Sequence, residues 1–358
     1  MTLSNPKHLR RLYEVIVLKK ILLLNPDLKL NIQSFKTGIE IIFPSTEALI
    51  NNELFIDEDI VYKLVCKIPN FDGSKAFSYI IKQCDYGPRY PGSEGHSLFK
   101  DYLIDFVTDL SDSVIVYEHE IKHPYKDHNI TLFNIFARFN PDAKERFIIM
   151  AHWDTREIAD KDKNIENLNK PIIGANDGAS GVGVILTLAE ILHILPPLNI
   201  GIDLLFVDGE DQGRSRDSEN FGLGTQAFAR HVPHPRPQFA ICLDMVADRE
   251  QHFPVEHFSL QYAPKVVQAI WTLANDLGYL QFEKKIGPAI MDDHYYLYKH
   301  AKIPAIDIID FDYPNKEINY WHTIQDVPEN CSSESLSAIG TVITQFIYQK
   351  DMEYEIKK

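Results

Sequence analysis

Two adjacent acids, Glu210 and Asp211, follow the apolar run at 204–207 and are bounded by Gly209 and Gly213. An apolar run of this length between glycines is typical of a central strand covered on both faces. Acids at the end of such a strand lie in the crevice where open α/β sheets bind ligands. Because neighbouring side chains diverge there, one acid can bind a metal while the other transfers protons. A solvated Glu-Asp turn is the alternative, and the pair alone does not exclude it.

A histidine and an aspartate end a second apolar run. His152 and Asp154 follow the short strand predicted at 147–151, and their i, i+2 spacing directs both side chains to one face. A histidine beside a carboxylate suits a metal ligand with its hydrogen-bonding partner, or two separate ligands. A purely structural His–Asp pair is the alternative interpretation.

A third carboxylate, Asp177, stands in a Gly-Ala-Asn-Asp-Gly turn directly before the apolar helix predicted at 180–195. Aspartate is a good helix N-cap, so capping is one interpretation of this residue. Asn176 or Ser180 could cap the helix instead and leave Asp177 facing the crevice. A carboxylate oxygen is a standard zinc ligand, so the second interpretation makes Asp177 a candidate for metal binding.

Two later segments bring further polar side chains to the same predicted edge. Asp292, Asp293 and His294 open a predicted helix, and His322 follows Trp321 after the last predicted strand. Adjacent carboxylates in one crevice repel each other when ionised, so one keeps a raised pKa or shares a proton. The Trp-His pair also fits an aromatic side chain packed near a surface histidine.

The elements that must position these residues alternate along the chain. Helices are predicted at 72–84, 96–110, 180–195, 264–277, 292–300 and 335–348, and strands at 113–117, 131–139, 147–151, 200–207, 238–246 and 303–309. Strands alternating with helices predict an α/β fold, a three-layer sandwich with a mostly parallel, mixed central sheet.

The 358 residues divide into two predicted parts. Residues 61–358 form the predicted catalytic domain, and residues 1–60 form an N-terminal extension of unknown role. Within the extension, alternating stretches at 28–32 and 39–43 could pair as a small hairpin. The net charge of −15 excludes non-specific nucleic-acid binding, which needs a basic surface.

The remaining sequence signals concern cysteines and membranes. Four cysteines lack CxxC spacing, which argues against a zinc–thiolate site, while a Cys66–Cys84 bridge stays open. No apolar run approaches the length of about 20 residues that a bilayer-spanning helix needs, so no transmembrane segment is expected. The basic N-terminal segment lacks the cleavage pattern of a credible signal peptide.

In chain order, the motifs are His-x-Asp, Gly-Ala-Asn-Asp-Gly, Gly-Glu-Asp, Leu-Asp-Met-Val, Asp-Asp-His and Trp-His-Thr. This series resembles the co-catalytic zinc aminopeptidase superfamily. Within it, the chain looks most like the glutaminyl-peptide cyclotransferases, or glutaminyl cyclases. The resemblance covers residues 70–350 and implies an enzyme that acts on peptide or protein N-termini, with N-terminal glutamine converted to pyroglutamate.

The resemblance also implies roles for particular residues. A single zinc would be held by Asp177, Asp211 and His322, with Glu210 as the general acid/base. The family commonly has Glu-Glu where this chain has Glu210-Asp211. Aspartate is one methylene shorter, so the metal or the strand end must shift slightly.

Further positions match the substrate pocket and proton network of the family. Asp244 and Asp292 correspond to acids of the hydrogen-bonded network, and Trp321 corresponds to the aromatic wall of the pocket. Asp293 and Asp307 are assigned to substrate binding, although Asp307 falls near a position where some cyclases carry histidine.

The ligand set fits two activities, because His152 and Asp244 match second-metal ligands of two-zinc aminopeptidases, with Asp154 a further second-metal or outer-sphere candidate. Trp321 and the long loop at 212–222 favour the cyclase. A catalytically inactive metal-binding relative is the third hypothesis. We expect one zinc for a cyclase and two for a peptidase, a monomer, and, from the resemblance, export to a periplasmic or secreted location.

Overall fold

The computed structural model describes residues 33–35, 38–41 and 64–356. The chain divides into two compact units, Met1–Pro69 and Asn70–Lys358. In the first unit, β1 (Gln33–Phe35), β2 (Gly38–Ile41) and β3 (Leu64–Lys67) form an antiparallel sheet in that order. Of the predicted hairpin, the stretch at 28–32 lies outside the described residues.

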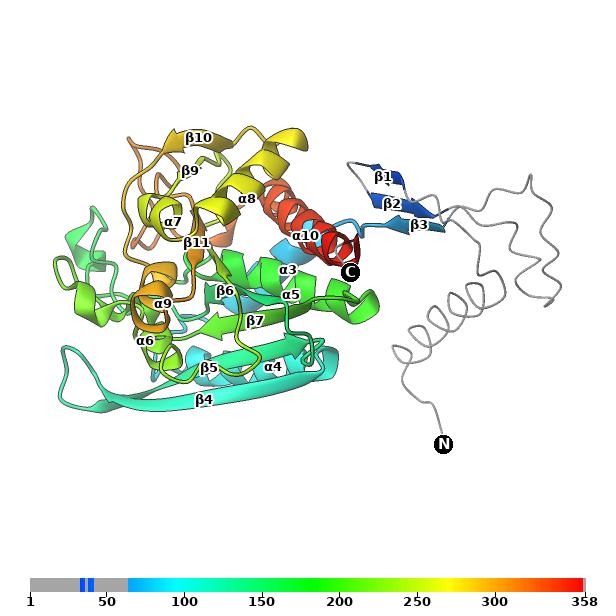
Figure 1. Cartoon of the computed structure of the whole chain (residues 1–358). Helices are drawn as coiled ribbons and strands as arrows, with labels where there is room; N and C mark the ends of the chain where they lie inside the picture. Colours follow the sequence, from blue (N-terminus) through cyan, green and yellow to red (C-terminus); the bar gives the residue numbers. More distant parts are fainter. Residues whose placement is uncertain (1–32, 36–37, 42–63, 357–358) are drawn as a thin grey trace, which may run out of the picture. The chain divides into compact units, whose positions relative to one another are not determined.

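The second unit is built around a six-stranded mixed sheet (Figure 1). Its strands, from one edge to the other, are β11 (Ala305–Ile309), β8 (Ala240–Asp244), β6 (Arg146–His152), β7 (Gly201–Val207), β5 (Asn129–Phe139) and β4 (Ser113–Lys122). The four strands from β11 to β7 are parallel, and β5 and β4 add antiparallel pairs. The three central parallel strands β8, β6 and β7 are buried along their whole length, as expected for strands covered on both faces.

Helices cover both faces of this sheet (Figure 1). One face carries α3 (Gly73–Cys84), α4 (Glu94–Leu110), α5 (Ala179–Ile194) and α10 (Ser333–Ile356). The other face carries α6 (Leu223–Phe228), α7 (His257–Tyr262) and α9 (Asp293–Ala301), while α8 (Pro264–Asp276) packs between α7 and α10. The apolar helix α5 is almost wholly buried because it lies between the sheet and α3.

The strand register brings the carboxyl ends of the parallel strands to one edge. His152 at the end of β6 pairs with Val207 at the end of β7, and Ile309 at the end of β11 pairs with Asp244 at the end of β8. Because Met150 pairs with Cys242, His152 and Asp244 lie level with each other across the β6–β8 pair. The polar residues that follow these strands therefore share one crevice.

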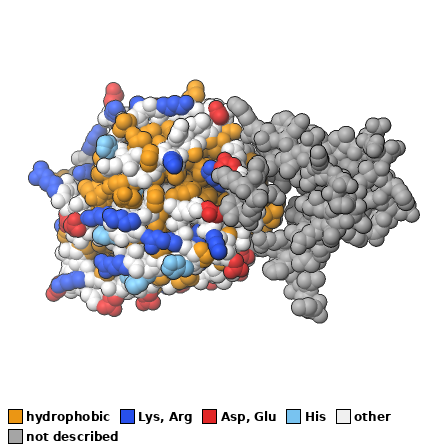
Figure 2. Space-filling model, in the orientation of Figure 1, with side chains coloured by type: hydrophobic (Ala, Val, Ile, Leu, Met, Phe, Trp, Pro, Cys, Tyr) orange, Lys and Arg blue, Asp and Glu red, His pale blue; other side chains and the backbone are white. Residues whose placement is uncertain are grey.

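An aromatic cluster joins α7 to α9, on the face where Figure 2 shows hydrophobic side chains gathered. The rings of Tyr262 and Tyr298 stack with centroids 3.9 Å apart, and Phe258 contacts both Tyr262 and Tyr295. Stacked and tilted aromatic pairs contribute about 0.5–1.5 kcal/mol each beyond their buried area. The cluster fixes α9, whose first residue Asp293 lies at the sheet edge, relative to α7.

The fold class predicted from the sequence is confirmed. The long predicted helices and strands occur at their predicted places, but the strand predicted at 113–117 extends to Lys122 and the helix predicted at 335–348 extends to Ile356. The prediction lacked the short elements α6, α7, β9 (Phe253–Val255) and β10 (Phe282–Ile286). The strands β9 and β10 have only three and five residues and form a separate two-stranded sheet.

Two further expectations concern the described part of the chain. Among those residues, no helix combines the length and apolar character that crossing a bilayer requires. Cys84, Cys242 and Cys331 are free thiols, and the side chain of Cys66 lies outside the described residues.

The contact of α5 with the sheet generates a stability prediction. A Cβ at Gly181 would overlap the carbonyl oxygen of Leu243 in β8 and lie 2.8 Å from Cβ of Ala151 in β6. We expect Gly181→Ala to destabilise the protein by about 1–3 kcal/mol, because neither neighbour can move without shifting a strand. Thermal unfolding should show a lower Tm than for the exposed helix control Thr108→Ala, and equal Tm values would contradict the prediction.

Candidate active site

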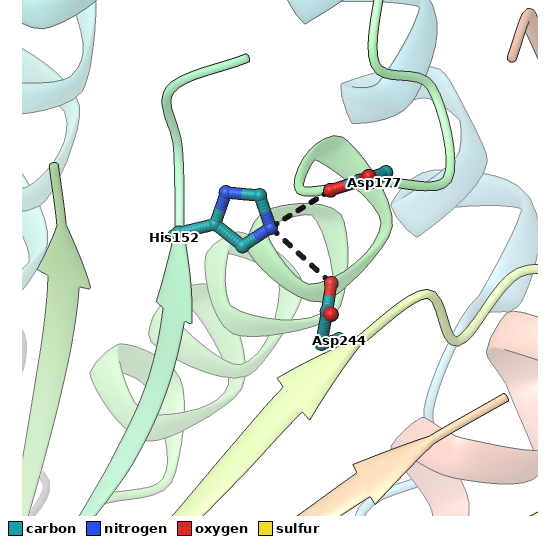
Figure 3. Close-up of side chains that lie close together, drawn as sticks. All are labelled: His152, Asp177 and Asp244. Carbon is teal, nitrogen blue, oxygen red and sulfur yellow. Dashed lines mark hydrogen bonds and ion pairs between the residues drawn. The ribbon is translucent and has the colours of Figure 1, made fainter. Parts of the chain in front are cut away.

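Three acidic or basic side chains from three elements meet at the sheet edge (Figure 3). His152 ends β6, Asp244 ends β8, and Asp177 lies in the turn before α5. Nε2 of His152 is 3.2 Å from Oδ1 of Asp177 and 3.2 Å from Oδ1 of Asp244. Burial alone would lower the pKa of His152, but the carboxylates of Asp154, Asp177 and Asp244 raise it well above its ordinary value.

A second cluster shares Asp177. Nε2 of His322 lies 3.2 Å from Oδ1 of Asp211 and 3.7 Å from Oδ2 of Asp177. All three residues are buried, and Oδ2 of both aspartates has no hydrogen-bond partner. Buried carboxylate oxygens without partners are costly, so they mark a place where a cation fits. Each of the two clusters places its three candidate ligand atoms within 4.8 Å of one another.

The capping interpretation of Asp177 is wrong. Helix α5 begins at Ala179 with Gly178 as its N-cap, and no side chain caps it. Instead, the backbone N–H groups of Asn176 and Asp177 donate to the two carboxylate oxygens of Asp326, at 2.8 and 3.2 Å. The turn is therefore held from behind by Asp326, and the Asp177 carboxylate points toward the two histidines.

Asp154 holds the acid turn. Its Oδ1 and Oδ2 accept hydrogen bonds from the backbone N–H groups of Glu210 and Asp211, at 3.1 and 3.3 Å. The turn begins at Gly209, whose φ of 67° lies in the left-handed region that glycine adopts without strain. Asp154 belongs to neither of the two clusters around Asp177. The solvated-turn interpretation of the Glu-Asp pair is wrong, because both acids are buried.

Sequence reasoning missed the cation that holds Asp211. Nη1 of Arg156 donates to Oδ1 and to the carbonyl oxygen of Asp211, at 2.7 and 3.1 Å, and Nε donates to Asp160 at 2.7 Å. Asp160 also lies 3.4 Å from Nδ1 of His322. Burial opposes ionisation of Asp211, but His322 and Arg156 together lower its pKa below the ordinary value.

Sequence reasoning also missed Arg89, because the loops that it joins are distant from it in sequence. Its fully buried guanidinium donates to the carbonyl oxygens of Trp153, Ile173 and Gly174, at 3.2, 3.0 and 3.0 Å. Trp153 follows His152, and Gly174 opens the turn that carries Asp177. One side chain thus links two of the loops that supply candidate ligands.

The remaining predicted acids form a buried group beside the two clusters. Burial and the neighbouring Asp292 raise the pKa of Glu210, Asp293 and Asp307 well above their ordinary values. Burial also raises the pKa of Asp244 to about 7, although the hydrogen bond from His152 opposes this shift. Carboxyl groups with raised pKa values retain protons more readily than ordinary carboxyl groups, which suits them to proton transfer.

Trp321 lies at the border of the site. Its half-buried indole stacks on the ring of His322, with centroids 3.7 Å apart, and packs against Phe311 at 4.9 Å. The stacking fixes the imidazole of a candidate ligand and presents an aromatic surface beside it.

The predicted covering loop, 212–222, is tied to the β4–β5 hairpin. The hydroxyl of Tyr125 donates to Asp217 at 2.7 Å, and the guanidinium of Arg214 lies 4.1 Å from the Tyr125 ring centroid. A small pocket beside them is lined by Tyr125, Arg214, Arg156 and Asp211, among others. The loop therefore closes one side of the crevice.

Residues 134–347 match the model of peptidase family M28, and the chain belongs to that family. It is similar to the glutaminyl-peptide cyclotransferase of Boiga dendrophila, with 23% identity over 293 residues that span 73% of this chain and 77% of the relative. The resemblance predicted from the sequence is thereby confirmed.

Solved structures agree in fold. The glutaminyl cyclase of Tannerella forsythia is 38% identical, with a TM-score of 0.75 over 78% of this chain and 99% of that chain. A Zn-dependent exopeptidase from Parabacteroides distasonis is 35% identical, with a TM-score of 0.74 over 78% and 99%. The family membership and the zinc-dependent neighbour support zinc as the metal of this site.

The salt bridge between Arg156 and Asp211 generates a prediction about metal binding. We expect Arg156→Met to weaken zinc binding about 10–100-fold, because side chains that orient metal ligands typically contribute that much. Competition with a chromophoric chelator measures the affinity. The exposed Arg249→Met is the control and should bind zinc like the unaltered protein; equal affinities for the two variants would refute the role of Arg156.

Proposed function

We propose that this protein is a glutaminyl-peptide cyclotransferase, which converts N-terminal glutamine of peptides to pyroglutamate and releases ammonia. The observation that carries the proposal is the convergence of Asp177, Asp211 and His322 beside the buried Glu210. The similarity to solved glutaminyl cyclases over nearly their whole length supports it. We assign the activity to the unit Asn70–Lys358, which contains every residue of the site.

The donor set fits zinc. Two carboxylates and one imidazole are ordinary zinc ligands, and ligands about 2.1 Å from a tetrahedral zinc lie about 3.4 Å from one another. The separations of His322 Nε2 from Asp211 Oδ1 and from Asp177 Oδ2 are 3.2 and 3.7 Å. Bound by these side chains, zinc would act as a Lewis acid on the side-chain carbonyl of the substrate glutamine.

We assign the proton transfers of the reaction to Glu210. Its carboxylate accepts a proton from the substrate α-amine as that nitrogen bonds to the side-chain amide carbon. The same proton is then returned to the amide nitrogen, whose bond to carbon breaks so that ammonia leaves. A raised pKa suits both directions of transfer, because the group gains and loses a proton readily near neutral pH.

The other residues position the reactants. Asp292 and Asp244 would hold the leaving nitrogen, with Asp293 and Asp307 completing the acidic side of the pocket; Asp292 lies close enough to Asp244 to contribute to its raised pKa. Trp321 provides the aromatic wall. The attack is intramolecular because the amine and the amide belong to one glutamine, and holding the amine against the amide carbon fixes the reactive geometry.

A two-zinc aminopeptidase is the second candidate function. The cluster of His152, Asp177 and Asp244 favours it, because it offers a second ligand set that shares Asp177 with the first. We propose instead that His152 orients Asp177 and Asp244 through its Nε2 contacts of 3.2 Å.

Substrate assays separate the candidates. We expect ammonia from Gln-β-naphthylamide, no amine from Leu-p-nitroanilide, and one zinc per chain by elemental analysis. A chelator should abolish ammonia release and added zinc should restore it. Amine release with two zinc ions per chain would establish the peptidase, and no product from either substrate would indicate an inactive metal-binding relative.

Substitution at Glu210 tests its role. We expect Glu210→Gln to lower kcat for ammonia release roughly 10²–10⁴-fold, since an amide cannot cycle the proton. Zinc content should stay the same, because the side chain is assigned to proton transfer. Glu219→Gln, in the same loop but exposed, is the matched control. Retained turnover in Glu210→Gln would rule out this residue as the general acid/base.

A further inference from the structure

A buried pair of one glutamate and one histidine lies next to the group of buried acids, and neither of the two residues has been assigned a role above. Glu256 precedes α7, and its carboxylate accepts from the backbone N–H groups of Phe258, Ser259 and Ile290, at 2.9, 2.6 and 2.9 Å. It also accepts from the Ser259 hydroxyl at 2.8 Å and lies 3.0 Å from Nε2 of His294. A carboxylate held by this many donors is a fixed anchor.

His294 connects this anchor to the acid group. The ring belongs to α9 and is fully buried. With Nε2 held by Glu256, the other nitrogen, Nδ1, faces Oδ2 of Asp307 at 3.7 Å. Neither Nδ1 nor either carboxylate oxygen of Asp307 has a hydrogen-bond partner. The unpartnered imidazole nitrogen is thus aimed at an unpartnered carboxyl group.

A second link runs from the same anchor to Asp307. The Ser259 hydroxyl, which donates to Glu256, accepts a hydrogen bond from the backbone N–H of Asp307 at 2.9 Å. Both the backbone and the side chain of Asp307 are therefore positioned from Glu256. The aromatic cluster between α7 and α9 keeps the two helices, and hence Glu256 and His294, in register.

Asp307 is in turn placed against Asp292. Ligand-type atoms of Asp292, His294 and Asp307 all lie within 4.8 Å of one another. A series of neighbouring side chains therefore runs from Glu256 through His294 and Asp307 to Asp292, the acid assigned above to the leaving nitrogen.

We propose that His294 is a positioning residue for catalysis: anchored by Glu256, it fixes the carboxyl group of Asp307 and thereby the position of Asp292 opposite Glu210. The inference rests on the proposed function, in which Asp292 holds the leaving nitrogen. Misplacement of a catalytic group by about 1 Å can lower a rate 10²-fold, so the pair affects kcat without contacting substrate.

Two substitutions of His294 separate catalysis from stability. The amide of Asn occupies the place of Nδ1 and retains a donor toward Asp307, while the amide of Gln occupies the place of Nε2 and retains only the contact with Glu256. We expect His294→Gln to lower kcat for ammonia release roughly 10²-fold with KM changed less than about threefold, and His294→Asn to lower it less than about tenfold. A purely structural His294 would reverse this order or lower kcat equally in both, which would overturn the proposal.

Three controls complete the experiment. The unaltered protein is assayed in parallel, so that absence of ammonia there overturns the proposed function, whereas normal ammonia release with unaffected His294→Gln overturns only the positioning role. Metal content should be equal in all variants, and loss of one equivalent in His294→Gln would make the cluster a metal site instead. Asp203→Asn, which breaks the buried ion pairs to Arg138 and Arg146 elsewhere in the sheet, should lower Tm without lowering kcat.

A further substitution keeps the proposal testable if the His294 variants do not fold. Ser259→Ala removes one hydroxyl and with it the second link to Asp307. We expect a kcat about three- to tenfold lower, again with nearly unchanged KM. Unchanged kcat in Ser259→Ala would count against the anchoring of Asp307 by Glu256.

Discussion

The concentration of carboxylates at one edge of the sheet is the constraint on which the rest of this structure depends. Removing an ionised carboxylate from water is unfavourable unless a cation, a hydrogen-bond donor or a proton compensates it. The protein uses all three means. Arg156 compensates Asp211, backbone N–H groups compensate Asp154 and Asp326, and the acids around Asp292 keep raised pKa values.

This compensation is distributed between two sides of the crevice. On one side, His322 and Arg156 face the carboxylate of Asp211 and favour its ionised form. On the other side, Glu210 and Asp307 lie among further acids with fewer donors, which favours protonated carboxyl groups. Carboxyl groups of the same residue types therefore differ in their preference for the ionised form because their surroundings differ.

The sequence predicted the layers of the fold because long buried strands and the apolar helix α5 leave local patterns. It also predicted that His152, Asp177, Asp211 and His322 lie at one edge, since each follows a predicted strand or precedes a helix. It could not decide between capping and metal binding for Asp177, because that choice depends on Asp326, which is 149 residues away.

The supporting residues were beyond sequence reasoning for the same physical reason. Three of the carbonyl groups that Arg89 contacts lie 64 to 85 residues further along the chain, and a single arginine in a Pro/Gly-rich turn gives no sign of them. Glu256 and His294 are 38 residues apart and meet only because α7 and α9 pack together. Local patterns locate elements, whereas these contacts arise from tertiary packing.

Asp177 belongs to two clusters at once, and this has a consequence for substitutions at the site. A change at this position disturbs both clusters together, so neither cluster can be altered alone through the shared carboxylate. A substitution at Asp177 therefore acts on both clusters directly, whereas a substitution at Asp244 or at His322 acts directly on one cluster only.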